Sequence, residues 1–126
     1  KKIIVQTPED LTIISALCSG SKVSQSQIKY LKQNKVFLLP IKRPYKETNN
    51  INKKIESIIK FEFIENSKSK NFIQSENDNI LDLLAIDVFK KNNNFEIVLL
   101  FKKNMAITLF AEIVEATLED IKKVND

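Results

Sequence analysis

Hydrophobic and polar residues alternate along most of this chain, which is the period of a β-strand that buries one face. Residues 27–43 contain two such runs and predict a hairpin with its turn near Gln33 and Asn34. Pro40 cannot donate to a neighbouring strand, so the second of these runs is expected at an edge or a bend. Three segments in the second half, together with residues 55–65, bring the prediction to six strands. Those segments are residues 80–90, 95–102 and 105–113.

The alternation also predicts which side chains face the core. In residues 55–65, Ile59, Phe61 and Phe63 are expected on one face. For the last three strands, the expected inward rows are Leu84, Ile86 and Val88; Phe95, Ile97, Leu99 and Phe101; and Met105, Ile107, Leu109, Ala111 and Ile113.

The opposite face of the last two strands is also apolar. Val98, Leu100 and Phe110 fall on this outer face, where an alternating strand normally carries polar residues. We therefore expect a helix or another subunit to cover part of it. These three residues are a candidate self-association face.

Two segments have helical signals. In residues 7–20, Thr7 is a suitable cap, Pro8 suits the first turn, and Gly20 stands where a left-handed cap is needed. In residues 117–126, Thr117 is followed early by acidic and late by basic side chains, which predicts a short C-terminal helix.

Polar stretches separate these elements. Residues 44–54 and 66–79 are predicted to be connections, the second unusually long. The lysine and asparagine breaks at 90–94 and 102–104 are predicted turns, because asparagine tolerates the left-handed conformations that turns need. Antiparallel hairpins with a helix at each end predict an α+β fold with a six-stranded sheet curled into a half-barrel. A pleckstrin-homology-like barrel with its terminal helix is one form of this architecture.

Length and composition favour a single domain over residues 1–126. The one cysteine, Cys18, excludes an internal disulfide and fits a reducing compartment. No apolar run approaches the ~18 residues of a membrane-spanning helix, and no signal-peptide core follows Lys1. We therefore expect a cytoplasmic protein without a membrane partner.

The net charge of +4 and the sequence pI of about 9.1 raise the possibility of an anionic partner. The chain nevertheless has one arginine, one glycine, 13 asparagines and 18 isoleucines. Lysine, asparagine and isoleucine have A/T-rich codons, so a biased genome accounts for this composition. A surface selected for nucleic acid would be expected to keep arginine, whose planar group matches phosphate and guanine.

The chain lacks the residues that most catalytic mechanisms require. Without histidine, the commonest general base and most zinc sites are excluded. One glycine cannot form a phosphate-binding loop. Cys18 lies on an apolar helix face, as a buried hydrophobe does. Asp82 and Asp87 are five residues apart in one predicted strand, so they should lie on opposite faces. We predict no catalytic residue, cofactor or metal ligand.

The best candidate contact surface is the strand exit formed by Lys42, Arg43, Tyr45 and Lys46. An arginine beside an aromatic side chain is common at interfaces and phosphate sites. The alternative is an edge-strand exit, where lysine and proline discourage aggregation and the tyrosine packs with its hydroxyl in water.

The order of several segments resembles the family called domain of unknown function 2948. The most specific pieces are Glu9-Asp10-Leu11, the strand Leu81–Ile86, and the ending Glu112–Ala116 followed by Leu118 and Asp120. The resemblance covers nearly the whole chain and implies a cytoplasmic bacterial protein, since members are found in alphaproteobacteria. Typical members carry an aromatic residue, often tryptophan, near the position of Tyr45. The resemblance implies no activity or cofactor.

Three functions remain open. The first is a non-enzymatic binding or scaffold domain with a protein partner, which includes a second copy of itself. The second is binding of an anionic ligand or nucleic acid by the Lys42–Lys46 segment. The third, an enzyme with a site in the sheet cavity, is disfavoured by the missing histidine and glycine.

Overall fold

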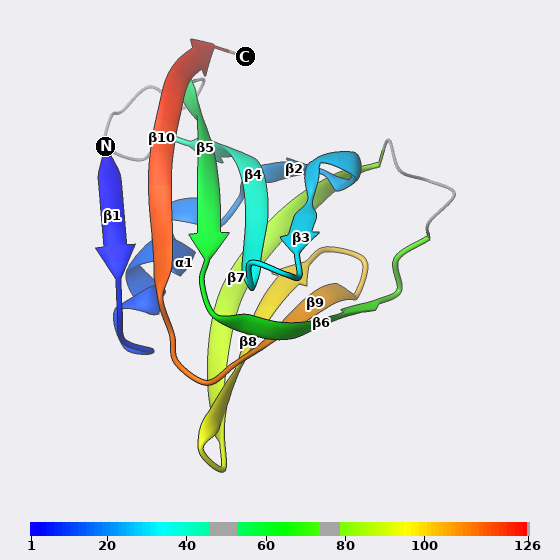
Figure 1. Ribbon diagram of the computed structural model, residues 1–126. Coiled ribbons are helices and arrows are strands. Elements are labelled where there is room, and N and C mark those ends of the chain that lie inside the picture. Colours follow the sequence, from blue (N-terminus) through cyan, green and yellow to red (C-terminus); the bar gives the residue numbers. More distant parts are fainter. Residues whose placement is uncertain (46–52, 74–78, 126) are drawn as a thin grey trace.

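The computed structural model describes residues 1–45, 53–73 and 79–125, whose strands form one antiparallel sheet (Figure 1). The strand order is β1-β10-β5-β4-β2-β7-β8-β9-β6, and β3 pairs with β4 beside this path. The elements in chain order are β1 (Lys2–Val5), α1 (Leu11–Cys18), β2 (Lys22–Ser24), the 3₁₀ turn η1 (Gln25–Gln27), β3 (Lys29–Leu31), β4 (Val36–Pro44), β5 (Lys53–Phe61), β6 (Ile64–Lys70), β7 (Ile80–Lys91), β8 (Asn94–Phe101), β9 (Met105–Ala111) and β10 (Ala116–Asn125).

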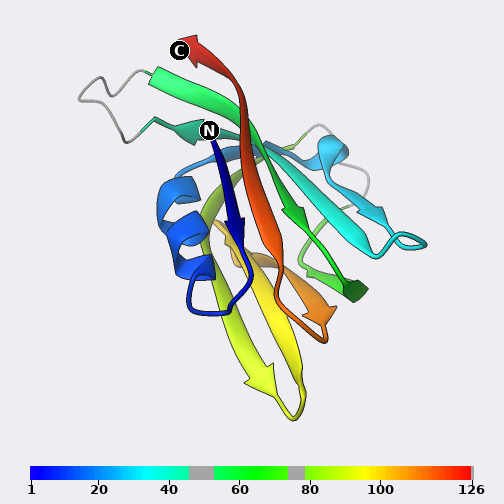
Figure 2. The same ribbon diagram turned by 60° about the vertical axis from the view of Figure 1, so that its left-hand side comes forward.

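The sheet curls on itself without closing. Figures 1 and 2 show the half made of β1, β10, β5 and β4 turned against the half made of β8, β9 and β6, with α1 beside β7. A sheet with this many twisted strands curls readily. The predicted α+β character with a curled antiparallel sheet is therefore confirmed, but the described residues form ten strands and not six.

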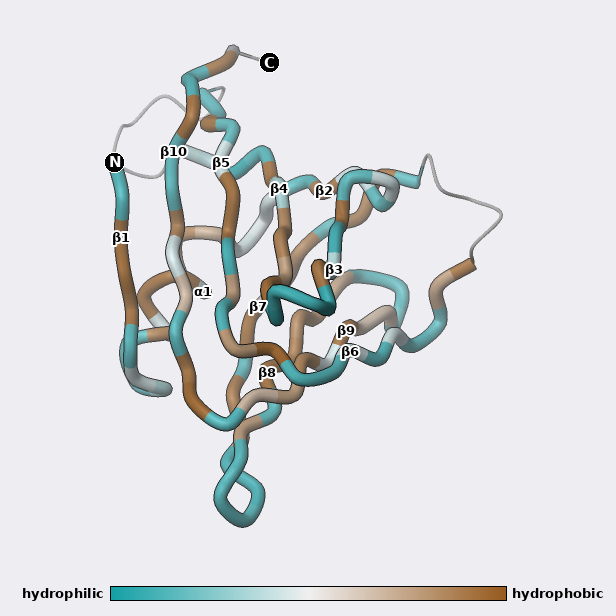
Figure 3. The backbone as a smooth tube through the Cα atoms, in the orientation of Figure 1, coloured by the Kyte–Doolittle hydropathy of each residue, from teal (hydrophilic) through white to brown (hydrophobic). Residues whose placement is uncertain are grey.

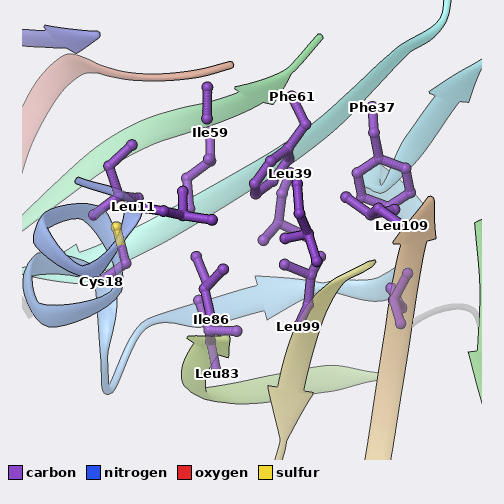
Figure 4. Packing of buried hydrophobic residues seen from close by; sticks show 14 of the residues in the cluster. Leu11, Cys18, Phe37, Leu39, Ile59, Phe61, Leu83, Ile86, Leu99 and Leu109 are labelled. Carbon is purple, nitrogen blue, oxygen red and sulfur yellow. The ribbon is translucent and has the colours of Figure 1, made fainter. Parts of the chain in front are cut away.

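The hydrophobic core lies between the two halves of the sheet and α1. Leu11 and Cys18 of α1 point toward Ile59 and Ile86, as Figure 4 shows. Leu11, Cys18 and Ile59 are at most 1% exposed. Each fully buried side chain of this size stabilises the fold by roughly 1.5–3 kcal/mol relative to the exposed residue. The helix thus closes one side of the core that the curled sheet leaves open.

The alternation holds without interruption in β8 and β9. Ile97, Leu99 and Phe101 are buried in β8, and Phe95 packs against the core from the start of the strand. In β9 every predicted inward residue within the strand is buried. The turns on either side are also confirmed, because Asn92 and Asn104 have positive φ of 56° and 58°. Figure 3 shows the hydrophilic tip between β7 and β8.

The prediction for β7 was wrong in part because the strand contains a bulge. Its pairing with β8 shifts between Leu83 and Ala85, so that Leu83 and Ile86 are buried while Leu84 is 45% exposed. A bulge adds one residue and reverses the faces that follow it. For the same reason Asp82 and Asp87 lie on the same outer face and not on opposite ones.

Two other inward assignments fail where strands end. Phe63 is 44% exposed and has a φ of 60°, because the chain turns there from β5 into β6. Ile113 is 49% exposed beyond the end of β9. The predicted connection at residues 66–79 is also wrong in its first part, since β6 extends to Lys70 and pairs with β9. Residues 74–78, and residues 46–52 of the earlier connection, lie outside the described residues.

The predicted C-terminal helix is wrong, because residues 116–125 form the strand β10. This strand pairs with β1 on one side and β5 on the other. An isolated helix of ten residues is marginal, whereas two neighbouring strands satisfy the backbone of the segment on both sides. Ala116 and Leu118 are buried, which is the two-residue period of a strand. The terminal helix that a pleckstrin-homology-like barrel would require is therefore not formed by residues 116–125.

The N-terminal helix is confirmed but is shorter than predicted. It begins at Leu11, and the hydroxyl of Thr7 accepts a hydrogen bond of 3.1 Å from the Asp10 backbone in the preceding turn. Gly20 has a φ of 88° just after the helix, as the sequence predicts, and its backbone N–H donates to Leu83 at 2.8 Å. With 8 residues, α1 is too short to cross a membrane, and no other helix of the described residues could do so.

We predict that Gly20→Ala lowers the free energy of unfolding by about 1 kcal/mol, because an L-residue is strained at positive φ. An added Cβ would lie 3.5 Å from Cγ of Pro44, an ordinary contact, so the cost comes from the backbone. Urea unfolding followed by circular dichroism measures it. Ser19→Ala is the matched control, since Ser19 has a φ of −58°. Equal stability of the two variants would contradict the requirement for glycine.

Candidate functional site

A buried ion pair joins β4 to the C-terminal strand. Arg43 is 0% exposed, and its Nε and Nη2 donate to the two carboxylate oxygens of Asp120 at 3.1 and 3.0 Å. Ser57 of β5 donates its hydroxyl to Oδ1 of the same carboxylate at 2.6 Å. An arginine that holds both oxygens of a carboxylate fixes geometry as well as charge. Arg43 is therefore part of the interior of the protein.

The surroundings of Asp120 act on its pKa in opposite directions. Burial alone would raise the pKa, but the hydrogen bonds from Arg43 and Ser57 and the charge of Arg43 lower it below the usual value. A carboxyl group with a lowered folded-state pKa adds stability above its unfolded-state pKa of about 3.9. That stability is lost as the pH falls through the lower folded-state value.

The structure thus corrects the predicted contact surface. Arg43 cannot reach a partner, because the alternation of Phe37, Leu39 and Ile41 continues to position 43 and turns its side chain inward. That alternation was the signal that could have identified it. Lys46 lies outside the described residues. Lys42 and Tyr45 are half-buried and lie at different hollows.

Tyr45 lines a hollow of about 510 Å³ at the end of the sheet. The Nζ of Lys123 lies 4.7 Å from the centre of the Tyr45 ring, and Lys122 contacts Glu56 at 3.7 Å. Asp120 reaches this hollow from the inner side, where Arg43 neutralises it. We call this hollow the Tyr45 pocket; its lining residues are Lys1, Tyr45, Ile55, Asp120, Ile121, Lys122 and Lys123.

The sequence did not reveal this pocket, because its lysines come from a segment that was predicted to be a helix. In β10 the pairing of Lys123 with Ile55 brings residue 123 close to the end of β4, where Tyr45 follows Pro44. Strand pairing, and not sequence spacing, therefore brings the aromatic ring and the ammonium group together.

Lys42 lines a different hollow on the outer face of β4, β5 and β2. This hollow measures about 570 Å³, and it adjoins one of about 380 Å³ that shares Ile58 and Ile121 with it. Two of the other charged groups at the rim are already paired: Lys22 contacts Asp82, and Glu56 contacts Lys122. These paired charges and the shared isoleucines make a largely neutral, partly apolar groove.

A further hollow of about 450 Å³ lies where β3 and β6 approach each other. The hydroxyl of Tyr30 donates to the Ile64 carbonyl at 2.8 Å and joins the two sides. Gln25 also lines it; its Nε2 donates to the Ile73 carbonyl at 3.2 Å, while its Oε1 is buried and has no hydrogen-bond partner among the residues that the structure describes. No sequence motif marks Gln25, because its place in this hollow depends on the approach of two strands that are distant in the sequence.

Val98, Leu100 and Phe110 lie where they were predicted, on the outer face of β8 and β9. All three are half-buried. The predicted cover is not the helix, because α1 contacts β7 and β4 and packs into the core. Lys68 of β6 places its Nζ 5.7 Å from the centre of the Phe110 ring. We call this surface the Phe110 face; its outward residues are Ala85, Asp87, Phe89, Glu96, Val98, Leu100, Ala106, Thr108, Phe110, Asn66, Lys68 and Lys70.

The described residues hold no group of three or more histidine, cysteine, aspartate or glutamate side chains that could bind a metal. Cys18 is buried in the core beside Leu11. The arrangement can thus offer an apolar sheet face, a neutral groove and a small basic pocket with an aromatic wall.

Comparison with known proteins agrees with the resemblance seen in the sequence. A family model described as "Protein of unknown function (DUF2948)" matches residues 2–126, so the predicted family is confirmed. No curated protein matches the chain. Among solved structures, an uncharacterized protein from Neisseria gonorrhoeae is similar at 16% identity, with 92% of this chain and 96% of that chain covered and a TM-score of 0.47.

We predict that Arg43→Met lowers the free energy of unfolding by about 3 kcal/mol, because the Asp120 carboxylate is left largely buried without its cation. The double variant Arg43→Met with Asp120→Leu should recover most of the loss, since it removes both charges. Chemical denaturation measures all three proteins.

Lys60→Met is the control for that series. It removes an exposed pair with Glu62 at 3.2 Å and should cost less than about 1 kcal/mol. If Arg43→Met costs no more than this control, the buried pair does not have the role that its geometry indicates.

Proposed function

The chain belongs to the DUF2948 family of proteins of unknown function, and we propose that it is a non-enzymatic binding domain whose partner is a protein. The observation that carries this proposal is the Phe110 face. Val98, Leu100 and Phe110 form an apolar strip on the outside of the sheet, although polar residues are usual on a solvated sheet face. Apolar strips of this kind with charged borders are typical of protein interfaces.

The remaining features are compatible with a binding role. At the larger of the two hollows that share Ile58 and Ile121, Lys22 and Glu56 are paired with Asp82 and Lys122, and pairing leaves these groups poorly suited to general acid–base work. The absence of histidine from the sequence argues in the same direction. We further propose a cytoplasmic location, because the lone cysteine fits a reducing compartment, and a bacterial source, which the family resemblance implies.

We predict that Phe110→Asp abolishes capture of the partner by this protein. The substitution removes the largest apolar side chain of the strip, and the new carboxylate would have to lose its water when the partner covers the strip. Tagged wild-type and variant proteins are compared in a pull-down from a lysate of the source organism at low and at moderate salt, with mass spectrometry of the captured proteins.

Ile113→Asp is the matched control, because it adds the same charge at a 49% exposed isoleucine outside the Phe110 face. A stoichiometric protein captured by wild type and Ile113→Asp, but lost from Phe110→Asp, supports the proposal. Equal capture by both variants would show that the partner binds elsewhere. Circular dichroism of both variants confirms that they remain folded.

A second candidate function is binding of an anionic ligand or single-stranded nucleic acid in the Tyr45 pocket. The observation that favours it is the position of Lys123 over the Tyr45 ring, with Lys122 and Lys1 beside the same hollow. An aromatic ring for stacking beside several ammonium groups suits a base and its phosphate. Of the predicted segment this proposal retains Tyr45 alone, because Lys42 lines a different hollow and Arg43 is buried.

We predict that Lys123→Glu weakens binding of a labelled single-stranded oligonucleotide by at least about tenfold at low salt, because a phosphate contact becomes a repulsion. Fluorescence anisotropy at several salt concentrations measures the affinity. Lys91→Glu, at a largely exposed lysine of the β7–β8 hairpin, makes the same charge change far from the pocket. Equal effects of the two substitutions, or no binding by wild type, would exclude this function.

A further inference from the structure

The Phe110 face is ordered by strand pairing into rows that run across the sheet. In the central row, Asp87 pairs with Val98, Val98 with Thr108, and Thr108 with Lys68. An acidic residue therefore stands at one end of this row and a basic residue at the other. Asp87 forms no ion pair within the described residues, and Lys68 contacts the Phe110 ring.

The neighbouring rows hold one charged residue each, a carboxylate on β8 in one and an ammonium group on β6 in the other. Beside Phe110, Lys91 and the carboxylates of Glu65 and Glu112 border the face. One row contains Phe89, Glu96, Phe110 and Asn66, and the other contains Ala85, Leu100, Ala106 and Lys70. Glu96 is paired with Lys91 at 3.4 Å, so the difference in charge between the two sides of the face depends mainly on Asp87 and Lys68.

We propose that the Phe110 face binds a second copy of this chain, face to face, about a twofold axis that runs along the strands between β8 and β9. This inference rests on the proposed function and names its partner. Rotation about that axis places β7 of one copy over β6 of the other. Asp87 then meets Lys68 of the second copy at both ends of a self-complementary interface, and Val98 meets Thr108 beside the axis.

The charges select this orientation over the other face-to-face packing. A twofold axis across the strands would place β7 over β7 and β6 over β6. Asp87 would then face Asp87 of the second copy, and Lys68 would face Lys68. Like charges at an interface suppress a binding mode, whereas complementary ones fix the register.

The size of the face indicates a weak dimer. Four strands spaced about 4.8 Å apart and about 25 Å long present roughly 500 Å² from each copy. The total of about 1,000 Å² is at the lower limit for a specific interface. We therefore expect a dissociation constant on the order of 10–100 μM, since small interfaces of this composition bind transiently.

A charge-swap experiment tests the proposal. Sedimentation equilibrium of the full chain from about 5 to about 500 μM, at about 50 mM salt, compares wild type with Asp87→Lys, Lys68→Asp and the double variant. Each single reversal should raise the dissociation constant at least about tenfold, because the twofold axis creates two like-charge contacts. The double variant restores opposite charges and should return to within about threefold of wild type.

The controls separate folding from association. Glu9→Lys reverses an exposed charge away from this face and should dimerise as wild type does. Melting temperatures of all variants confirm the fold. A monomeric wild type at every concentration, unaffected single variants, or a double variant that stays monomeric would each overturn the twofold dimer. If wild type is monomeric yet captures another protein in a Phe110-dependent manner, only this inference fails and the protein-binding proposal stands.

Discussion

The insertion of the C-terminal strand between β1 and β5 is the constraint on which most of this structure depends. β10 pairs with β5 along its length and with β1 over residues 116–119, and it brings Ala116 and Leu118 into the core. The same strand carries Asp120 to Arg43 and Lys123 to Tyr45. Without it, β1 and β5 would present unpaired edges, and a buried arginine would lack its carboxylate. One segment thus supports the core, the interior ion pair and the basic pocket.

How far the sequence predicts this fold depends on how far each strand keeps a regular register. In β8 and β9 the two-residue period is unbroken, so the buried residues can be read directly from the alternation in the amino-acid sequence. In β7 and β10 the pairing shifts, between Leu83 and Ala85 and between Asp120 and Lys122. A bulge has no composition signal in these segments, so the faces beyond it cannot be assigned from alternation alone. The C-terminal strand was missed for a different reason: local helix signals are weak and long-range pairing overrides them.

The candidate sites show the same division between local and long-range information. Val98, Leu100 and Phe110 were found because their face follows from local alternation within two regular strands. At Arg43 the charge and the aromatic neighbour favour a surface site, but its place in an inward row predicts the burial that the structure shows. Its carboxylate partner is 77 residues away in the sequence, and only the topology brings the two together. A charged residue that continues a buried row is best interpreted as half of an ion pair, since burying it alone is costly.

The same reasoning distinguishes the surfaces that remain. Around the groove of Ile58 and Ile121, Lys22 and Glu56 already form ion pairs within the chain, so their charges are largely neutralised before any partner binds. On the Phe110 face, Asp87 has no ion-pair partner among the described residues, and it lies at the opposite end of a row from Lys68. Their separation across four strands is too large for strong attraction within one molecule in water. Opposite charges that lie apart on one apolar surface can form ion pairs with a second surface of complementary charge. A copy of the same surface rotated about the twofold axis has that complementary charge.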